Sequence, residues 1–129
     1  MNRLDFPYDE KYDPAMPVVE VVLDGYAGLD SKAVMAIIDS GADGTMLPID
    51  VLEALGALYQ DTVQMRGVLG ESERVDRYTV GLKLGAITLH GINSVAIPAG
   101  TESVIGRDVL NQLLLTLNGP AFTTQIEIE

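Results

Sequence analysis

The sequence predicts a single all-β domain, mainly strand, with one or two short helices. The chain has 129 residues, of which 47% are hydrophobic, and this is enough to bury one core. Short apolar or alternating segments follow one another, separated by turns that contain glycine, aspartate or proline. Only two segments have helical spacing, and none approaches the roughly 18 apolar residues that cross a bilayer.

The first half of the chain is expected to contain two strands and a short helix. Residues 1–17 hold three prolines among acidic and tyrosine residues, which predicts an N-terminal arm. Residues 18–23 form an apolar strand that ends at an Asp-Gly turn. Residues 32–38 form a second strand, and its apolar end is predicted to be buried on both faces. Residues 49–58 have apolar side chains at helical spacing.

The second half is expected to be mostly strand. Residues 59–99 are predicted to form a series of strands with turns at residues 67–70, Gly85 and Gly91. Residues 107–115 then show the apolar spacing of a helix.

The last residues suggest an extension to the domain. Gly119 and Pro120 break the chain, and residues 122–129 alternate apolar and polar side chains as a strand does. We therefore expect a domain over residues 18–118, with a strand extension over residues 119–129.

The composition disfavours several classes of function. The 19 acidic and 8 basic side chains give a net charge of −11, which would repel a nucleic acid. The chain has no cysteine, so neither disulfides nor thiolate zinc sites hold the fold. Its first residues lack the apolar segment of a secretory signal, and we expect a cytoplasmic protein with no membrane partner. The single histidine, His90, has no obvious partner and is expected at the surface.

The most informative segment runs from residue 36 to residue 48, where an apolar run ends at Asp39-Ser40-Gly41. An aspartate there is held at the end of a strand, where the fold can control its solvation. Asp-Ser-Gly alone is most often an ordinary turn. Apolar residues on both sides predict that this loop lies inside the protein. The segment occurs once, so a second carboxylate beside Asp39 has to come from another copy of the chain.

A calcium site is an alternative for the same segment. Asp39, Gly41, Asp43 and Asp50 stand at loop positions 1, 3, 5 and 12. Position 3 lacks a side-chain oxygen, position 12 is not a glutamate, and the entering segment is a strand rather than a helix. A metal site is therefore disfavoured.

Three motifs resemble those of the retropepsins, the dimeric aspartic proteases of retroviral type. Asp39-Ser40-Gly41-Ala42-Asp43 resembles their active-site loop, Gly67-Val68-Leu69-Gly70 their flap hairpin, and Val104-Ile105-Gly106-Arg107 the segment that precedes their C-terminal helix. The order and spacing of these motifs agree with the family from about residue 18 to residue 118.

This resemblance implies a retropepsin-like closed β-barrel half that acts as a homodimer and hydrolyses peptide bonds. One Asp39 from each copy would share a proton with its mate and activate a water against the scissile carbonyl. The mechanism needs no metal and no cofactor. The implied partners are a second copy and a peptide or protein substrate bound as an extended strand.

The same resemblance implies supporting roles. Ser40 stands where threonine is more usual and keeps a hydroxyl that can brace the two loops. The other implied active-site loop supports are Gly41, Ala42, Asp43, Gly106 and Arg107, with an ion pair between Asp43 and Arg107. The implied substrate-binding flap is Gly67, Val68, Leu69 and Gly70. Asp108 is interpreted as a solvated turn or cap residue.

Departures from the family pattern leave an alternative open. In the retroviral enzymes the termini of the two copies interleave to build the dimer. Residues 119–129 extend past the point at which those enzymes end. The extension and the arm over residues 1–17 predict a different arrangement of the termini. Gly44 also stands where a polar side chain often shapes a subsite. The alternative function is a catalytically inactive retropepsin-fold module for dimerisation or peptide binding.

Overall fold

The computed structural model describes residues 2–26, 31–67 and 69–128. The elements in these residues are β1 (Asn2–Pro7), β2 (Val18–Asp24), β3 (Lys32–Ile38), β4 (Met46–Pro48), α1 (Ile49–Leu55), β5 (Leu58–Arg66), β6 (Ser72–Leu84), β7 (Ile87–Ile97), β8 (Ser103–Ile105), α2 (Arg107–Leu110), β9 (Leu114–Asn118) and β10 (Thr123–Ile128). Strands hold 58% of the residues and helices 9%, which confirms the prediction of a mainly β protein. Among the described residues, neither helix has the length and apolar character needed to span a membrane.

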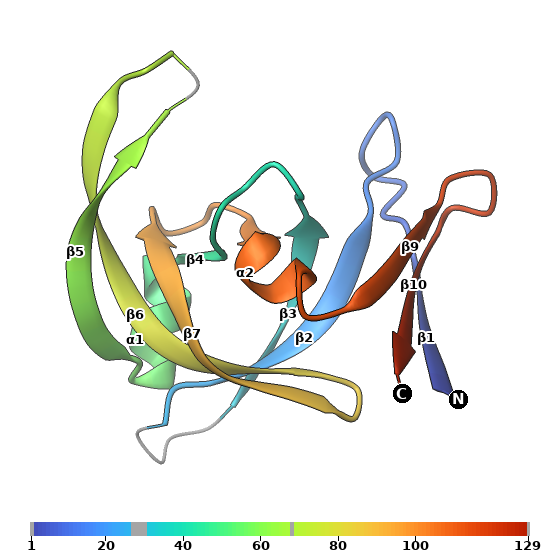
Figure 1. The fold of residues 1–129 in the computed structure, drawn as a ribbon, viewed down its shortest axis with the longest axis horizontal. Coiled ribbons are helices and arrows are strands. Elements are labelled where there is room, and N and C mark those ends of the chain that lie inside the picture. The colour runs from blue at the N-terminus through green and yellow to red at the C-terminus, as the bar shows by residue number, and fades with distance from the viewer. Residues whose placement is uncertain (1, 27–30, 68, 129) are drawn as a thin grey trace.

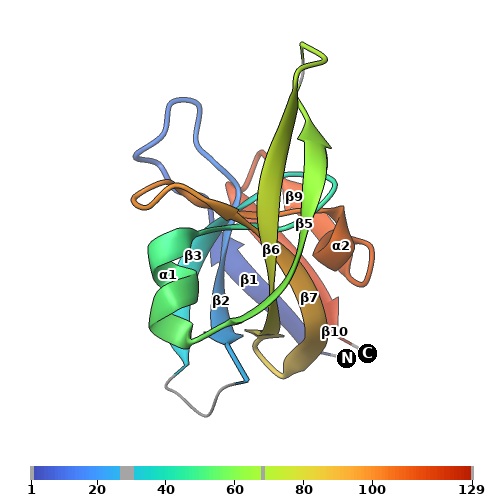
Figure 2. The ribbon, with the colours of Figure 1, turned by 90° about the vertical axis from the view of Figure 1, so that its left-hand side faces the viewer.

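Six strands close into a barrel. The larger sheet has the order β2-β3-β8-β4-β7-β6-β5, and an additional pairing of β2 with β6 joins its two sides. β5 stays outside this ring as the outer strand of a long hairpin with β6. Figures 1 and 2 show that this hairpin extends well beyond the barrel.

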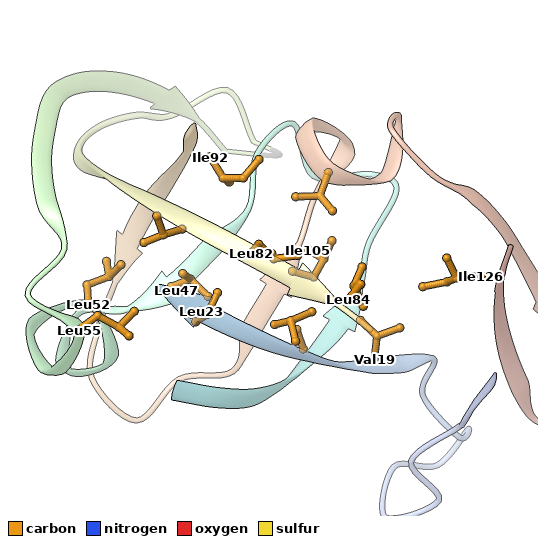
Figure 3. Close-up of a cluster of buried hydrophobic side chains, with 14 residues drawn as sticks. Val19, Leu23, Leu47, Leu52, Leu55, Leu82, Leu84, Ile92, Ile105 and Ile126 are labelled. Carbon is orange, nitrogen blue, oxygen red and sulfur yellow. The ribbon is translucent and has the colours of Figure 1, made fainter. Parts of the chain in front are cut away.

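Aliphatic side chains fill the barrel. Val19, Val21 and Leu23 alternate inward along β2, as the two-residue period of a strand requires. They meet side chains from β6, β8 and α1, and Figure 3 shows Leu82 and Ile105 near the centre of this cluster. These β-branched and leucine-rich segments supply the apolar area that stabilises the fold.

A second sheet, with the order β1-β10-β9, joins the two ends of the chain. In this sheet Leu4 pairs with Ile126, which in turn pairs with Leu115. Ile126 is fully buried and belongs to the core cluster (Figure 3). The terminal sheet therefore packs on the barrel and is part of the folded unit.

The prediction of an arm over residues 1–17 is wrong for residues 2–7, which form β1. Arg3 and Asp5 are exposed, whereas Leu4 and Phe6 pack against the core, so the segment alternates as a strand does. Pro7 obscures this signal, although proline is tolerated on an edge strand.

The rest of the arm is a loop with one internal bridge. Asp9 and Met16 exchange backbone hydrogen bonds of 2.8 and 3.0 Å. Tyr12 donates its hydroxyl hydrogen to Glu102, and this bond raises the pKa of Tyr12 to about 12. The loop is thereby attached to the segment that precedes β8.

Three local predictions are wrong. The strand over residues 32–38 is not buried on both faces, because Met35 is 55% exposed. Gly91 does not end a strand: it lies within β7, where His90 and Gly91 oppose Gly81 in a bulge that uses the positive φ of Gly91. The helix predicted over residues 107–115 ends at Leu110, because the chain turns there to pair β9 with β10.

Candidate active site

Asp39 follows β3 directly and begins a tight loop that leads to β4. Its backbone N–H donates to the Ile105 carbonyl at 3.1 Å, which continues the parallel pairing of β3 with β8. Its carboxylate Oδ1 accepts a hydrogen bond of 2.9 Å from the Gly41 N–H. Its carbonyl accepts another, of 3.1 Å, from the Ala42 N–H. The sheet and the turn together fix the position of this carboxylate.

The loop is not inside the protein, contrary to the expectation from its apolar neighbours. Asp39, Ser40 and Gly41 are all exposed in the protomer. The apolar residues around them pack on the barrel side, while the turn itself opens outward. The carboxylate is therefore accessible to a substrate or to a second copy of the chain.

A groove of about 860 Å³ opens in front of Asp39. Its floor is the loop from Asp39 to Gly44, and its walls come from β7 and from the β5–β6 hairpin. The apolar side chains on these surfaces are Met46, Val63, Met65, Val75, Ile92 and Val95. The groove combines an acidic floor with walls of mixed character, because the same strands also contribute Gln64, Arg66, Arg77, His90 and Asn93.

The hairpin tip occupies the place of the predicted flap. Gly67 donates to the Glu71 carbonyl at 2.8 Å, and its own carbonyl accepts from the Gly70 N–H at 3.0 Å. Gly70 has a φ of 86°, a conformation that favours glycine. Leu69 is 91% exposed, and Val68 lies outside the described residues.

The hairpin is fastened near its base by an ion pair. Arg77 of β6 donates to Asp61 of β5 through two hydrogen bonds of 2.8 and 2.6 Å. These bonds lower the pKa of the Asp61 carboxyl and raise the pKa of the Arg77 guanidinium. A shift in the β5–β6 register lies between Tyr59 and Asp61, immediately beside this pair.

Arg107 joins α2 to the active-site loop. Its backbone N–H donates to the Ala42 carbonyl at 2.9 Å, and its guanidinium donates to the Ser40 carbonyl at 2.7 Å. The guanidinium also pairs with the carboxylate of Asp43. The structure thus brings together all the residues that the sequence assigns to loop support, although Arg107 lies more than 60 positions after Ser40 and Asp43 in the chain.

We expect the two halves of this ion pair to respond differently to mutation. Asp43→Asn should change the free energy of unfolding by less than about 0.5 kcal/mol, because the Asp43 side chain is 94% exposed and the pair is screened by solvent. Arg107→Met should lower it by about 1–2 kcal/mol, because the Ser40 carbonyl loses a charged donor. Urea unfolding of both variants measures this difference. Equal losses in the two variants would contradict it.

A buried network that the sequence does not reveal lies behind the loop. Thr45 is fully buried and donates to Asp108 Oδ1 at 2.9 Å. The Thr45 hydroxyl oxygen accepts from the Gly106 N–H at 3.4 Å, and Asp108 also accepts from the Val109 N–H at 3.0 Å. Asp108 lies in the first turn of α2, as the interpretation of a turn or cap residue expects, but its carboxylate is part-buried and bonded to Thr45 rather than freely solvated. A polar threonine at the start of an apolar strand is the only signal of this network in the sequence.

Gly106 lies against the loop at a distance that admits no side chain. A Cβ there would be 2.5 Å from the carbonyl carbon and oxygen of Gly44 and 2.9 Å from the Ala42 oxygen. Glycine at this position is therefore required by close backbone contact.

In the part of the chain that the structure describes, the acidic and histidine side chains do not gather into a metal site. Within residues 2–26, 31–67 and 69–128, no group of three or more acidic or histidine side chains could hold a metal ion. His90 is exposed and stacks on Tyr26, with ring centroids 6.4 Å apart. It is one of the residues that line the groove.

A model of the aspartyl protease family matches residues 19–118. The chain belongs to the aspartyl protease family. A search of curated proteins finds no match to this chain.

Two solved structures share the fold of this aspartyl protease family member. A retropepsin-like aspartic protease from Rickettsia conorii superposes with a TM-score of 0.65 at 11% identity, over 97% of this chain and 90% of that chain. The EIAV protease complexed with the inhibitor HBY-793 gives a TM-score of 0.55 at 20% identity, over 75% of this chain and 86% of that chain. These similarities confirm the prediction of a retropepsin-like closed barrel.

Proposed function

We propose that the chain is a homodimeric aspartic endopeptidase in which each copy supplies one catalytic Asp39. The observation that carries this proposal is the position of Asp39, an accessible carboxylate on the floor of a groove of about 860 Å³. Arg107 braces the loop that presents this carboxylate, and the β5–β6 hairpin lines the groove with both apolar and polar side chains. A symmetric dimer supplies the second carboxyl.

The chemistry follows from the pairing of two carboxyl groups. At hydrogen-bond distance the two Asp39 side chains share one proton, because two carboxyl groups at so short a distance do not both ionise easily. The ionised carboxylate takes a proton from a bound water, whose oxygen attacks the scissile carbonyl carbon. The protonated carboxyl donates to the carbonyl oxygen. The tetrahedral intermediate then collapses as a proton passes to the amine that leaves.

The groove supports a peptide as the substrate class. An extended peptide between the hairpin and the floor can be held by main-chain hydrogen bonds while alternate side chains enter pockets. The apolar walls at Val63, Met65 and Ile92 favour apolar side chains around the cleaved bond. Closure of the hairpin would exclude water from the bound substrate.

The direct test is cleavage of a peptide library by the wild-type chain and by Asp39→Asn, with the products identified by mass spectrometry. Cleavage that depends on Asp39 supports the proposal. Peptide binding without cleavage by both proteins would instead indicate a peptide-binding module.

We expect kcat/KM to have a bell-shaped dependence on pH. Activity requires one proton in the Asp39 pair, so it should fall when the pair gains a second proton at low pH and when it loses the shared proton at high pH. Initial rates with one cleaved peptide across the stability range of the protein measure this. A rate that rises steadily into the alkaline range would contradict the shared-proton mechanism.

A further inference from the structure

The two terminal strands are already paired within one chain. Every residue of β1 has a partner in β10. Leu4 and Phe6 of β1 pack against the core, and Ile126 of β10 is fully buried in it. Interleaving the termini of two copies would break this ladder and expose these side chains. A dimer of this chain therefore has to use another edge.

The described part of the terminal sheet has two open edges, β1 and β9. The β1 edge carries Arg3, Asp5 and Pro7, and charged residues and proline are what natural sheets use to block edge pairing. β9 spans Leu114–Asn118 and contains neither a charge nor a proline. In a chain with a net charge of −11, this uncharged edge lets two copies approach without local repulsion. The outer strand of the other sheet, β5, carries Asp61 and Arg66.

Leucines are exposed on both faces of β9. Leu114 is 58% exposed and Leu117 is 50% exposed. They lie on opposite faces of the sheet, because successive side chains of a strand alternate and these two are three residues apart. Exposure on both faces is expected when a neighbouring strand is missing from the edge.

β9 is also tied to the candidate catalytic residue. Arg107, which holds the Ser40 carbonyl, is the first residue of α2, and α2 leads within a few residues into β9 (Figure 1). A strand pairs with its own copy antiparallel about a two-fold axis. The same symmetry is required to bring two Asp39 side chains together.

We propose that β9 pairs antiparallel with β9 of a second copy, giving a continuous six-stranded sheet in the order β1-β10-β9-β9-β10-β1. The choice of a second copy as the occupant rests on the proposed function, because one chain supplies only one Asp39. Each copy keeps its own termini. With Thr116 at the axis, Leu115 lies opposite Leu117 of the other copy, so apolar side chains meet on the core-facing side.

A single introduced cysteine tests this interface, because the chain has no cysteine of its own. Thr116→Cys is combined with Asp39→Asn, so that proteolysis cannot affect the result. We expect oxidation, or a short bismaleimide linker, to convert this double variant to a covalent dimer, which non-reducing electrophoresis detects. The matched control is Asp5→Cys on the charged edge of the same sheet, which should remain a monomer under the same conditions.

A charge on the β9 edge gives a second, reversible readout. Leu117→Lys should weaken dimerisation at least about tenfold in sedimentation velocity, because each lysine would lie opposite Leu115 of the other copy and bring a charge into this apolar contact. The control is Leu58→Lys on β5, where a leucine of similar exposure, 55% against 50%, lies outside the terminal sheet. Thermal melting checks that both variants are folded, and both positions are exposed enough to accept lysine.

Failure of the interface and failure of the enzyme are distinguishable. A covalent dimer through Thr116→Cys supports the interface even if no peptide is cleaved. The interface is overturned, and the enzyme is not, if the wild-type protein shows Asp39-dependent cleavage while residue 116 gives no linkage and Leu117→Lys sediments like the wild type.

Discussion

Asp39→Asn is expected to lower kcat/KM for peptide hydrolysis by at least about a thousandfold, the range of a lost general acid–base pair. An amide neither takes a proton from water nor shares one with a partner. Both positions of the pair change at once in a homodimer, so no functional carboxyl remains. The change keeps the shape of the side chain and its bond from the Gly41 N–H, so the loop should keep its position.

The matched control is Asp24→Asn at the end of β2. Asp24 accepts a hydrogen bond of 2.9 Å from the Tyr26 N–H, and an amide oxygen can still accept it. This variant removes the same charge outside the groove and should cleave at the wild-type rate. Cleavage by Asp39→Asn that matches the control would exclude Asp39 as the catalytic residue.

Mixing the two proteins tests whether two copies share one site. If subunits exchange freely, adding an equal amount of Asp39→Asn to the wild type should reduce the activity of a fixed amount of wild type to about half, because mixed dimers contain one carboxylate. Activity that does not change on mixing would indicate that each chain acts alone or that subunits do not exchange. Exchange is checked separately with a fluorescently labelled copy.

Gly106→Ala is expected to lower the free energy of unfolding by about 2–4 kcal/mol. The added Cβ would lie 2.5 Å from the Gly44 carbonyl and 2.9 Å from the Ala42 oxygen. Both contacts are with backbone, so relief requires the active-site loop or α2 to shift. Gly106 has a φ of −98°, which alanine adopts without strain, so the whole effect comes from the close contact.

Gly44→Ala is the matched control, because Gly44 is the residue whose carbonyl group the added Cβ at position 106 would meet. In the described part of the chain nothing lies within 4 Å of a Cβ placed on Gly44. Its stability should stay within about 0.5 kcal/mol of the wild type. Thermal unfolding separates the two, since a loss of about 3 kcal/mol lowers Tm by roughly 10 °C in a chain of this size. Equal melting temperatures would show that the loop and α2 move apart at little cost.

The sequence predicts those parts of the fold whose pattern is local. The alternation along β2, the apolar end of β3 and the helical spacing after Pro48 are all readable without tertiary information. The terminal sheet is different, because β1 is a short edge strand whose partner lies at the other end of the chain. Its proline and its charges outweigh the alternation of Leu4 and Phe6 in any local interpretation.

The candidate site shows the same division. Asp39, Arg107 and the glycines of the hairpin are found from motifs, because these motifs are continuous in the sequence. The network of Thr45 with Asp108 joins residues 63 positions apart, and neither has a distinctive neighbour. The exposure of Asp39 is also not predictable, because it depends on which side of the barrel the turn opens.

The Asp61–Arg77 pair and the register shift beside it have a mechanical consequence for the hairpin. A bulge bends a strand, and a two-bond ion pair immediately beyond it keeps the two strands together. The segment from Asp61 to the tip can therefore swing as a lever about 20 Å long, given a rise of roughly 3.3 Å per residue. Rotation by about 10° at this pivot would carry Leu69 along an arc of about 3–4 Å while the ladder of hydrogen bonds above the pivot stays intact.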